Sequence, residues 1–284
     1  MTLEPGLLSL VLFSAVLHAT WNAVIKAGED RLVITTLVMM VPGFPALVAL
    51  FFLPALAPEA WPFVVASALI HYAYYAGLIA AYRHGDLSLV YPIARGAAPA
   101  LVAVGAWILV DEALSAAELI GVLIVSAGIM SLASRRRAGA HDGEVKAIGF
   151  ALLTALSVAL FLLADGMGVR RSGFALSYIC WLFVLEGFPL LAFTLWARRG
   201  RIKAAFGPHL KHGAFGGVIN GVSYGIAIWA MGVGPMAHIV AVRETSVLIG
   251  AMIGTLVLKE PFGRTRIAAA AAVACGAVLL NVGG

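Results

Sequence analysis

The sequence has few charged residues and few cysteines. Only 12% of its 284 residues are charged, against about 25% in a soluble domain, so the chain cannot cover a water-facing surface. Its two cysteines, Cys180 and Cys275, lie in apolar runs and show neither metal-ligand spacing nor the pattern of a disulfide framework. The opening residues MTLEPG hold no positive charge, so the apolar run that follows is a poor signal peptide and a better first membrane helix.

The sequence also lacks the motifs of several enzyme classes. It contains no G-x-x-x-x-G-K-[ST] loop for ATP and no H-E-x-x-H pair for a catalytic metal. Asp165 is the only aspartate inside an apolar run, which argues against a paired-aspartate protease. The net charge of +5 comes from basic residues in a few short loops and does not indicate a nucleic-acid partner. We therefore expect a protein that is not an enzyme and that uses neither a metal nor a cofactor.

Long apolar runs dominate the chain. Hydrophobic residues make up 62% of it, and the mean hydropathy is +1.00. A hydrocarbon core of about 30 Å takes roughly 20 helical residues to cross, and a spanning segment has to satisfy its own backbone hydrogen bonds. The sequence therefore predicts an all-α integral membrane protein with ten transmembrane helices. The predicted spans are 7–26, 32–53, 62–82, 87–110, 115–134, 145–166, 175–196, 212–233, 236–258 and 264–282.

The two halves of the chain match each other. The block 82–132 recurs about 148 residues later, where Arg95 meets Arg243. Gly43-Phe44-Pro45 recurs as Gly187-Phe188-Pro189, 144 residues later. Five helices per copy is an odd number, which predicts two inverted repeats, a common plan of secondary transporters. The predicted organisation is a first repeat over 1–134, a cytoplasmic basic linker over 135–146 and a second repeat over 147–284.

The loops give a predicted orientation. Alternate loops hold fifteen Lys and Arg residues on one face, whereas the other face holds only Arg170 and Arg171. The positive-inside rule then predicts a multi-pass protein of a bacterial-type inner (plasma) membrane, in contact with lipid and with both termini outside the cytoplasm.

Two arginines lie deep in the predicted spans. Arg95 is 8 residues into its span and Arg243 is 7 residues into its own, so each lies roughly 11–12 Å deep, from opposite faces. Inverted repeats would place them near a central cavity, where their planar forks of donors suit carboxylate, phosphate or phosphonate. The alternative is that each arginine ties helices together through carbonyls or a nearby acid, with Glu244 and Glu186 as partners.

Further polar residues and prolines complete the predicted site. Proline can free a backbone carbonyl near the substrate path, and buried acids or histidines can take up a coupling proton. The predicted substrate contacts are Arg95, Arg243, Tyr75, Tyr224, Asn220, Trp21 and Asn22. The predicted coupling or gating residues are Glu186, Glu244, His71, Pro92, Pro45 and Pro189. Other buried polar candidates are His18, Tyr74, Asp165 and His238, of which Asp165 and His238 are expected at the membrane interface, and Glu112 is expected to cap the next helix or pair with loop lysines.

The duplicated block resembles a known family. The copies Leu87–Glu112 and Met236–Glu260, with Ala117–Gly121 and Gly128 after the first, are similar to ten-helix, EamA-like members of the drug/metabolite transporter superfamily. The segment His18–Lys26 is similar to a branch associated with phosphonate utilisation. The resemblance implies two inverted five-helix repeats around a central cavity, and export or exchange of small metabolites. It also implies cytoplasmic termini, against the orientation that the loop charges predict.

These observations predict a secondary transporter that moves a small polar metabolite, with an anion favoured, by alternating access, with a proton as a candidate coupling ion. The alternative is an exporter of amphipathic or cationic drugs, or of a lipid-linked substrate, on the same scaffold. An arginine-lined site would favour anions, and an aromatic, acid-lined site would favour cations. Closely spaced small residues in the last three spans would serve helix packing within the bundle or in a homodimer.

Overall fold

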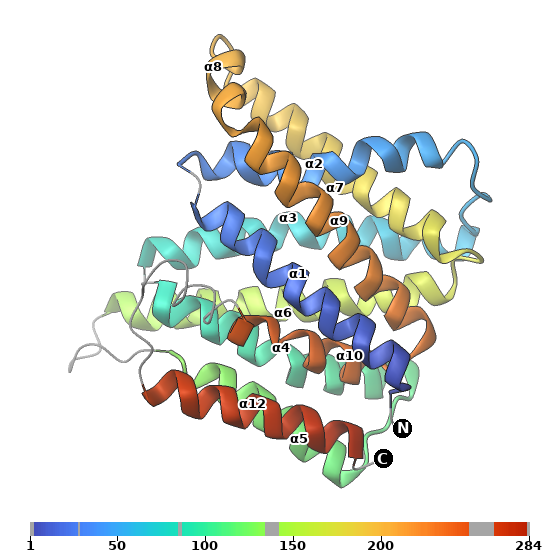
Figure 1. Cartoon of the computed structure of the whole chain (residues 1–284), viewed down its shortest axis with the longest axis vertical. Helices are drawn as coiled ribbons and strands as arrows, with labels where there is room; N and C mark the ends of the chain where they lie inside the picture. Colours follow the sequence, from blue (N-terminus) through green and yellow to red (C-terminus); the bar gives the residue numbers. More distant parts are fainter. Residues whose placement is uncertain (1–2, 28, 85–86, 134–141, 250–263, 283–284) are drawn as a thin grey trace.

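The computed structural model describes residues 3–27, 29–84, 87–133, 142–249 and 264–282. Every regular element within these ranges is helical (Figure 1). The elements are α1 (Pro5–Ala27), α2 (Arg31–Ala49), η1 (Pro58–Ala60), α3 (Trp61–His84), α4 (Leu87–Val110), α5 (Ala116–Met130), α6 (Asp142–Arg170), α7 (Ala175–Ala197), α8 (Ile202–Phe206), η2 (Gly207–His209), α9 (Leu210–Val233), α10 (Met236–Arg243) and α12 (Arg264–Val282).

The distribution of side chains is that of a multi-pass membrane protein. Phe51 and Phe52 are 81% and 84% exposed, whereas Asp165 and Glu244 are 0% and 1% exposed. Such a surface suits lipid, because exposed apolar groups face hydrocarbon at no cost and ionisable groups find partners inside the bundle. Six helical stretches within the described residues are long and apolar enough to cross a membrane, and they are Pro5–Ile25, Arg31–Ala49, Leu89–Val110, Val145–Arg170, Ala175–Ala197 and Ile202–Val233.

The Gly-Phe-Pro motifs lie where α2 crosses α7. A Cβ on Gly43 would lie 3.1 Å from the carbonyl oxygen of Phe183, and a Cβ on Gly187 would lie 2.9 Å from that of Met39. Glycine lets the two backbones approach this closely. Residues 39 and 183, like 43 and 187, are 144 apart in the sequence. The contact is therefore reciprocal: each glycine meets the residue four positions before the other.

The remaining helices pack in corresponding pairs. α3 packs on α6 as α1 packs on α9, and α5 lies beside α12 at one edge of the bundle (Figure 1). Arg198 at the end of α7 bonds Asp30 at the start of α2, while Ser177 in the first turn of α7 donates to the carbonyl of Pro54 beyond the end of α2. α2 and α7 are therefore antiparallel. The start of α1 and the end of α12 lie at the same end of the bundle (Figure 1).

The predicted span 236–258 is interrupted, because α10 ends at Arg243 and the chain becomes helical again at residues 246–249. Glu244 and Thr245 form a turn, in which the Thr245 backbone N–H bonds the carbonyl of Val242, three residues back. The Thr245 hydroxyl also donates to that carbonyl, at 2.7 Å. A side-chain bond to a carbonyl competes with the helical ladder, so the break needs neither glycine nor proline. The later part of the predicted span, including Glu260, lies outside the described residues.

The boundary between the two halves also differs from the prediction. α6 begins at Asp142, inside the predicted linker 135–146, so the last residues of that linker belong to the helix. Residues 135–141 of the predicted linker lie outside the described residues.

Candidate functional site

Arg95 and Arg243 lie in one buried group of side chains, which also contains His18 and Glu244 and which we call the arginine cluster. They come from α1, α4, the end of α10 and the turn after it. Arg95 binds Glu244 through two bonds, Nε to Oε2 at 3.1 Å and Nη2 to Oε1 at 2.6 Å. This two-bond geometry is the strong form of an arginine–carboxylate pair. Arg95 therefore has the acidic partner that the helix-tying alternative anticipates.

His18 lies between the two arginines. Its Nδ1 is 2.9 Å from Nη2 of Arg243, and its Nε2 is 3.4 Å from Nη2 of Arg95. A neutral imidazole has one acceptor nitrogen and one N–H. The shorter contact assigns the lone pair to Nδ1, so Nε2–H and the Arg95 Nη2–H groups are donors that face each other.

Arg243 has no carboxylate within hydrogen-bond distance among the described residues, unlike Arg95. Its Nε is buried and lacks a hydrogen-bond partner in this part of the chain. Its guanidinium carbon lies 5.2 Å from the centroid of the Tyr224 ring, a cation–π contact. Within the described residues, the direct partners of the Arg243 guanidinium are therefore the imidazole of His18 and the ring of Tyr224, while Glu244 and Asp165 act on it from further away.

A second buried group, which we call the carboxylate cluster, lies on the other side of Tyr224. It consists of His71, Asp165, Glu186, Tyr178 and Tyr224, from α3, α6, α7 and α9. Nδ1 of His71 is 2.9 Å from Oε1 of Glu186 and also 2.9 Å from the carbonyl oxygen of Ser67. The hydroxyls of Tyr178 and Tyr224 bond the two oxygens of the Asp165 carboxylate, so both of its oxygens have partners.

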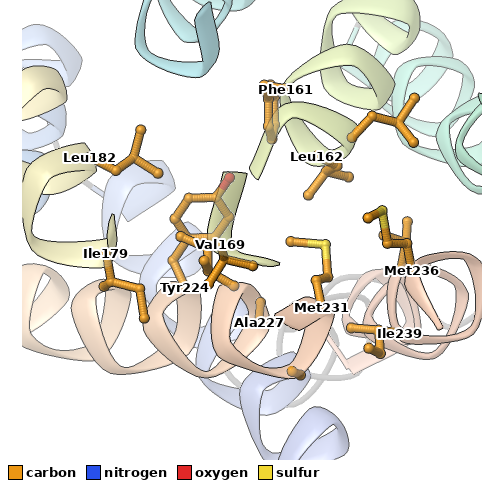
Figure 2. Packing of buried hydrophobic residues seen from close by; sticks show 14 of the residues in the cluster. Phe161, Leu162, Val169, Ile179, Leu182, Tyr224, Ala227, Met231, Met236 and Ile239 are labelled. Carbon is orange, nitrogen blue, oxygen red and sulfur yellow. The ribbon is translucent and has the colours of Figure 1, made fainter. Parts of the chain in front are cut away.

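Apolar side chains surround the ring that joins the two clusters. Figure 2 shows Tyr224 on α9 among Phe161, Ile179 and Leu182, with its hydroxyl oxygen at the end of the ring. The ring of Phe161 also stacks on His71, with centroids 3.8 Å apart. Low-polarity walls strengthen electrostatic interactions between the groups that they enclose.

The prolines act through the backbone. Pro189 cannot donate a hydrogen bond to the carbonyl of Leu185, four residues earlier. The Tyr72 hydroxyl lies 2.9 Å from the carbonyl oxygen of Leu185 and 2.8 Å from the carbonyl oxygen of Glu186. The carbonyl that Pro189 frees therefore has a hydrogen-bond donor, next to Glu186 of the carboxylate cluster. The side chains of Pro45 and Pro189 themselves are exposed on the outside of α2 and α7, away from both clusters. Pro92 is buried within α4, one turn before Arg95.

Five predicted substrate contacts lie outside the arginine cluster, and one of them, Tyr224, belongs to the carboxylate cluster and touches Arg243 with its ring. Trp21 touches it, because its ring meets that of His18 edge-on at 5.0 Å. Asn22 donates to the carbonyl of His18 within α1. Asn220 donates to the sulfur of Met39, at 3.7 Å. Tyr75 packs on a separate apolar cluster that also includes Trp21 and Met39.

Asp165 and His238, two of the buried polar candidates, are indeed buried, and the alternative that they are exposed at the membrane interface is not supported. Asp165 is fully buried because α6 continues to Arg170, which puts the carboxylate more than a turn inside the helix. His238 is 1% exposed, and its Nε2 is 3.1 Å from Oε1 of Glu118. Glu112 binds Arg170 at 2.6 Å and accepts the first backbone N–H of α10. Glu112 therefore joins α4 to α6 and α10 and does not cap α5, the next helix.

His18 is the residue that sequence reasoning placed among the buried polar candidates without assigning it to the site. Its spacing from Trp21 and Asn22 puts the three on one face of α1, which is a usable signal. That face could not be paired with the arginines without knowing which helices pack together.

The arginine cluster is closed to solvent among the described residues, because Arg95 and Arg243 are 5% and 4% exposed. Both arginines contact the same histidine directly. A surface pocket near the start of α1, lined by Leu7, Leu10 and Trp229 among others, contains none of the predicted site residues. No group of three His, Cys, Asp or Glu side chains within the described ranges is placed to hold a metal ion.

Comparison with known proteins identifies the fold and no more. No protein-family model matches the chain, and no curated protein matches it. Solved structures do match, with 29 chains similar to this one. One of them, described only as "Crystal structure of protein", has a TM-score of 0.75 and 15% identity, over 98% of this chain and 99% of its own. The chain therefore shares its overall fold with proteins of known structure.

Proposed function

We propose that the chain is a secondary transporter for a small acidic metabolite, and that the arginine cluster is its substrate site. The observation that carries this proposal is an excess of positive charge and of hydrogen-bond donors in that cluster. The two guanidinium groups carry two positive charges and the Glu244 carboxylate carries one negative charge. His18 adds none, because it is neutral in the assigned geometry. Taken by itself, the cluster thus carries a net charge of plus one.

An anion would remove that excess. A buried charge without a counter-ion is costly inside a membrane protein, so a bound carboxylate, phosphate or phosphonate is favoured there over a neutral solute. The donors that lack acceptors are Nε–H of Arg243 and the facing N–H groups of His18 and Arg95. Oxyanions with several acceptor oxygens fit several donors at once.

Glu244 supports the proposal as an internal substitute for the substrate. Its carboxylate already holds the fork of Arg95, which is the geometry that a substrate acid would adopt. Glu244 lies in the turn after α10, so it can leave Arg95 by a rearrangement of that turn without unwinding a long helix. In this mechanism an arriving acid exchanges with Glu244, and the exchange accompanies the opening of the closed site.

We further propose that the fold consists of two inverted five-helix repeats with ten membrane crossings, as in the EamA-like transporters that the sequence resembles. The reciprocal contacts of Gly43 and Gly187 and the corresponding helix pairs support this arrangement. Alternating access then consists of rocking one repeat against the other around the arginine cluster. The loop charges support a bacterial-type plasma membrane as the location, with the termini outside the cytoplasm.

One observation favours the alternative function. The carboxylate cluster combines two acids with two tyrosines, and the ring of Phe161 stacks on its histidine, a composition that suits an organic cation. A cation exporter on the same scaffold would bind its substrate there and use the arginines to tie the helices together.

Transport by the purified chain in proteoliposomes tests both functions. We expect uptake of small carboxylates, phosphonates or phosphate, with Arg243→Gln abolishing it while the protein still inserts and folds. Arg198→Gln is the matched control, because Arg198 binds Asp30 near the helix ends and should leave uptake intact. Normal anion uptake by Arg243→Gln would refute the anion site. Uptake of organic cations, lost in Asp165→Asn and not in Arg243→Gln, would establish the alternative.

A further inference from the structure

We propose that Glu186 is the proton-binding group of this transporter and that it takes up one proton for each negative charge bound at the arginine cluster. This inference rests on the proposed anion site. It follows from the directions of the hydrogen bonds in the carboxylate cluster and from the charges of the two clusters.

The surroundings of His71 favour a doubly protonated ring. The carbonyl oxygen of Ser67 can only accept, so Nδ1 of His71 is a donor, and Nδ1 also lies 2.9 Å from Oε1 of Glu186. Nε2 lies 3.4 Å from the Tyr224 hydroxyl, which is long for a hydrogen bond. We assign His71 as an imidazolium because it forms this ion pair with Glu186 and is also attracted electrostatically by Asp165.

The two carboxylates differ in how well they are bonded. Asp165 receives a tyrosine hydroxyl on each oxygen, which holds it in the ionised form. Glu186 is 5% exposed, and its Oε1 has no hydrogen-bond partner among the described residues although Nδ1 of His71 lies 2.9 Å away. Nδ1 of His71 bonds the carbonyl of Ser67 and forms an ion pair with this oxygen at the same distance of 2.9 Å. A proton added to Oε1 of Glu186 would replace that ion pair and leave the hydrogen bonds of Asp165 and Ser67 intact.

The charges of the two clusters are opposite. One imidazolium between two carboxylates gives the carboxylate cluster a net charge of minus one, and the arginine cluster carries plus one. Tyr224 connects them, because its ring lies under Arg243 and its hydroxyl binds Asp165. The pair is neutral as it stands, and electrostatic interaction between them is strong across a buried aromatic ring.

Binding of a monoanion breaks this balance. The arginine cluster becomes neutral, and the carboxylate cluster keeps an uncompensated negative charge. One proton from water, added to Oε1 of Glu186 to form a neutral carboxyl group, restores neutrality. The transported unit is then one proton with each anionic charge, moving in the same direction.

Charged and titratable groups from four helices face Glu186. They come from α3, α6, α7 and α9, and they are His71, Tyr72, Tyr75, Asp165, Tyr178 and Tyr224.

Calorimetry on the purified full-length chain tests the proposal. The probes are acetate and methanesulfonate, which are both ionised at neutral pH and release no proton of their own. Titration in two buffers of different ionisation enthalpy gives the number of protons taken up per anion bound. We expect about one for the wild type, none for Glu186→Gln with the anion still bound, and uptake restored in Glu186→Asp. Glu112→Gln, a carboxylate paired with Arg170 outside both clusters, is the control and should behave as wild type.

Infrared difference spectroscopy gives a second readout that a purely structural role would not change. Addition of acetate or methanesulfonate should produce the carbonyl band of a newly protonated carboxylic acid in wild type and not in Glu186→Gln. Anion binding without proton uptake in wild type would overturn the coupling and leave the anion site standing. Proton uptake that persists in Glu186→Gln would assign the proton to another group. No binding of either probe, together with no anion uptake in proteoliposomes, would refute the proposed function and this inference with it.

Discussion

Replacement of Glu244 by glutamine tests whether the Arg95–Glu244 pair belongs to a substrate site or is a purely structural ion pair. The change keeps the shape of the side chain and removes the one carboxylate of the arginine cluster. Arg95 and Glu244 are 7% and 1% exposed at the side chain and share two bonds. Removing one partner of such a buried pair costs about 3–5 kcal/mol, because the other charge is left uncompensated.

An anion that occupies the vacated fork should recover much of this loss. A ligand at about 100 times its dissociation constant stabilises the folded state by about 2.7 kcal/mol. The assay is thermal unfolding of wild type and Glu244→Gln in detergent, with increasing acetate, phosphate or methanesulfonate and with chloride as the reference salt. We expect the variant to be less stable without added oxyanion and to gain more stability from it than wild type does.

Glu112→Gln is the matched control for this experiment. Its partner Arg170 is 27% exposed at the side chain, and the pair lies at the helix ends, so the substitution should cost about 1 kcal/mol or less. It should also show no specific response to oxyanions. If Glu244→Gln responds to oxyanions no more than Glu112→Gln does, the reasoning from charge excess to anion binding is wrong.

Three further predictions test the fold and its surface. Tyr72→Phe leaves the proline-freed carbonyl of Leu185 without its partner, which should lower the free energy of unfolding by about 1–3 kcal/mol in thermal or denaturant titrations. Gly187→Ala should destabilise the α2–α7 crossing, because its Cβ would lie 2.9 Å from a backbone oxygen, whereas Gly6→Ala, with nothing within 4 Å, should have little effect in the same unfolding assay. Burial alone would raise the pKa of Asp30, but bonds from a backbone N–H and an arginine outweigh it and lower that pKa. The resulting stability is present above the unfolded-state pKa and lost as pH falls through the folded one, so the difference between wild type and Asp30→Asn should vanish at low pH.

The sequence predicted the helical membrane fold because long apolar runs admit few other structures. It also predicted that Arg95 and Arg243 are buried, since two unmatched charges in such runs have to turn inward. The pairing of Arg95 with Glu244 was one of two open alternatives. Periodicity could not choose between them, because the choice depends on how α4 and the end of α10 approach each other.

Other features depended on tertiary contacts that no local pattern records. The break after Arg243 comes from one threonine hydroxyl and tightened backbone bonds, and threonine is common in helices that do not break. The burial of Asp165 followed from a helix longer than its apolar run, which places the carboxylate against tyrosines of two other helices. The positions of the prolines predicted only some of the irregular backbone. Pro189 indicates the freed carbonyl of Leu185, but no proline is present at the break after α10.

The early end of α10 has a consequence for how tightly the cluster holds what it binds. The last carbonyls of a helix carry about half a negative elementary charge, and Arg243 belongs to the final turn of α10. The backbone itself thus offsets part of the attraction that a ligand would feel. A transporter has to release its substrate as readily as it binds it. The end of α10 at Arg243 lowers the affinity of the cluster for a bound anion without a second acidic residue.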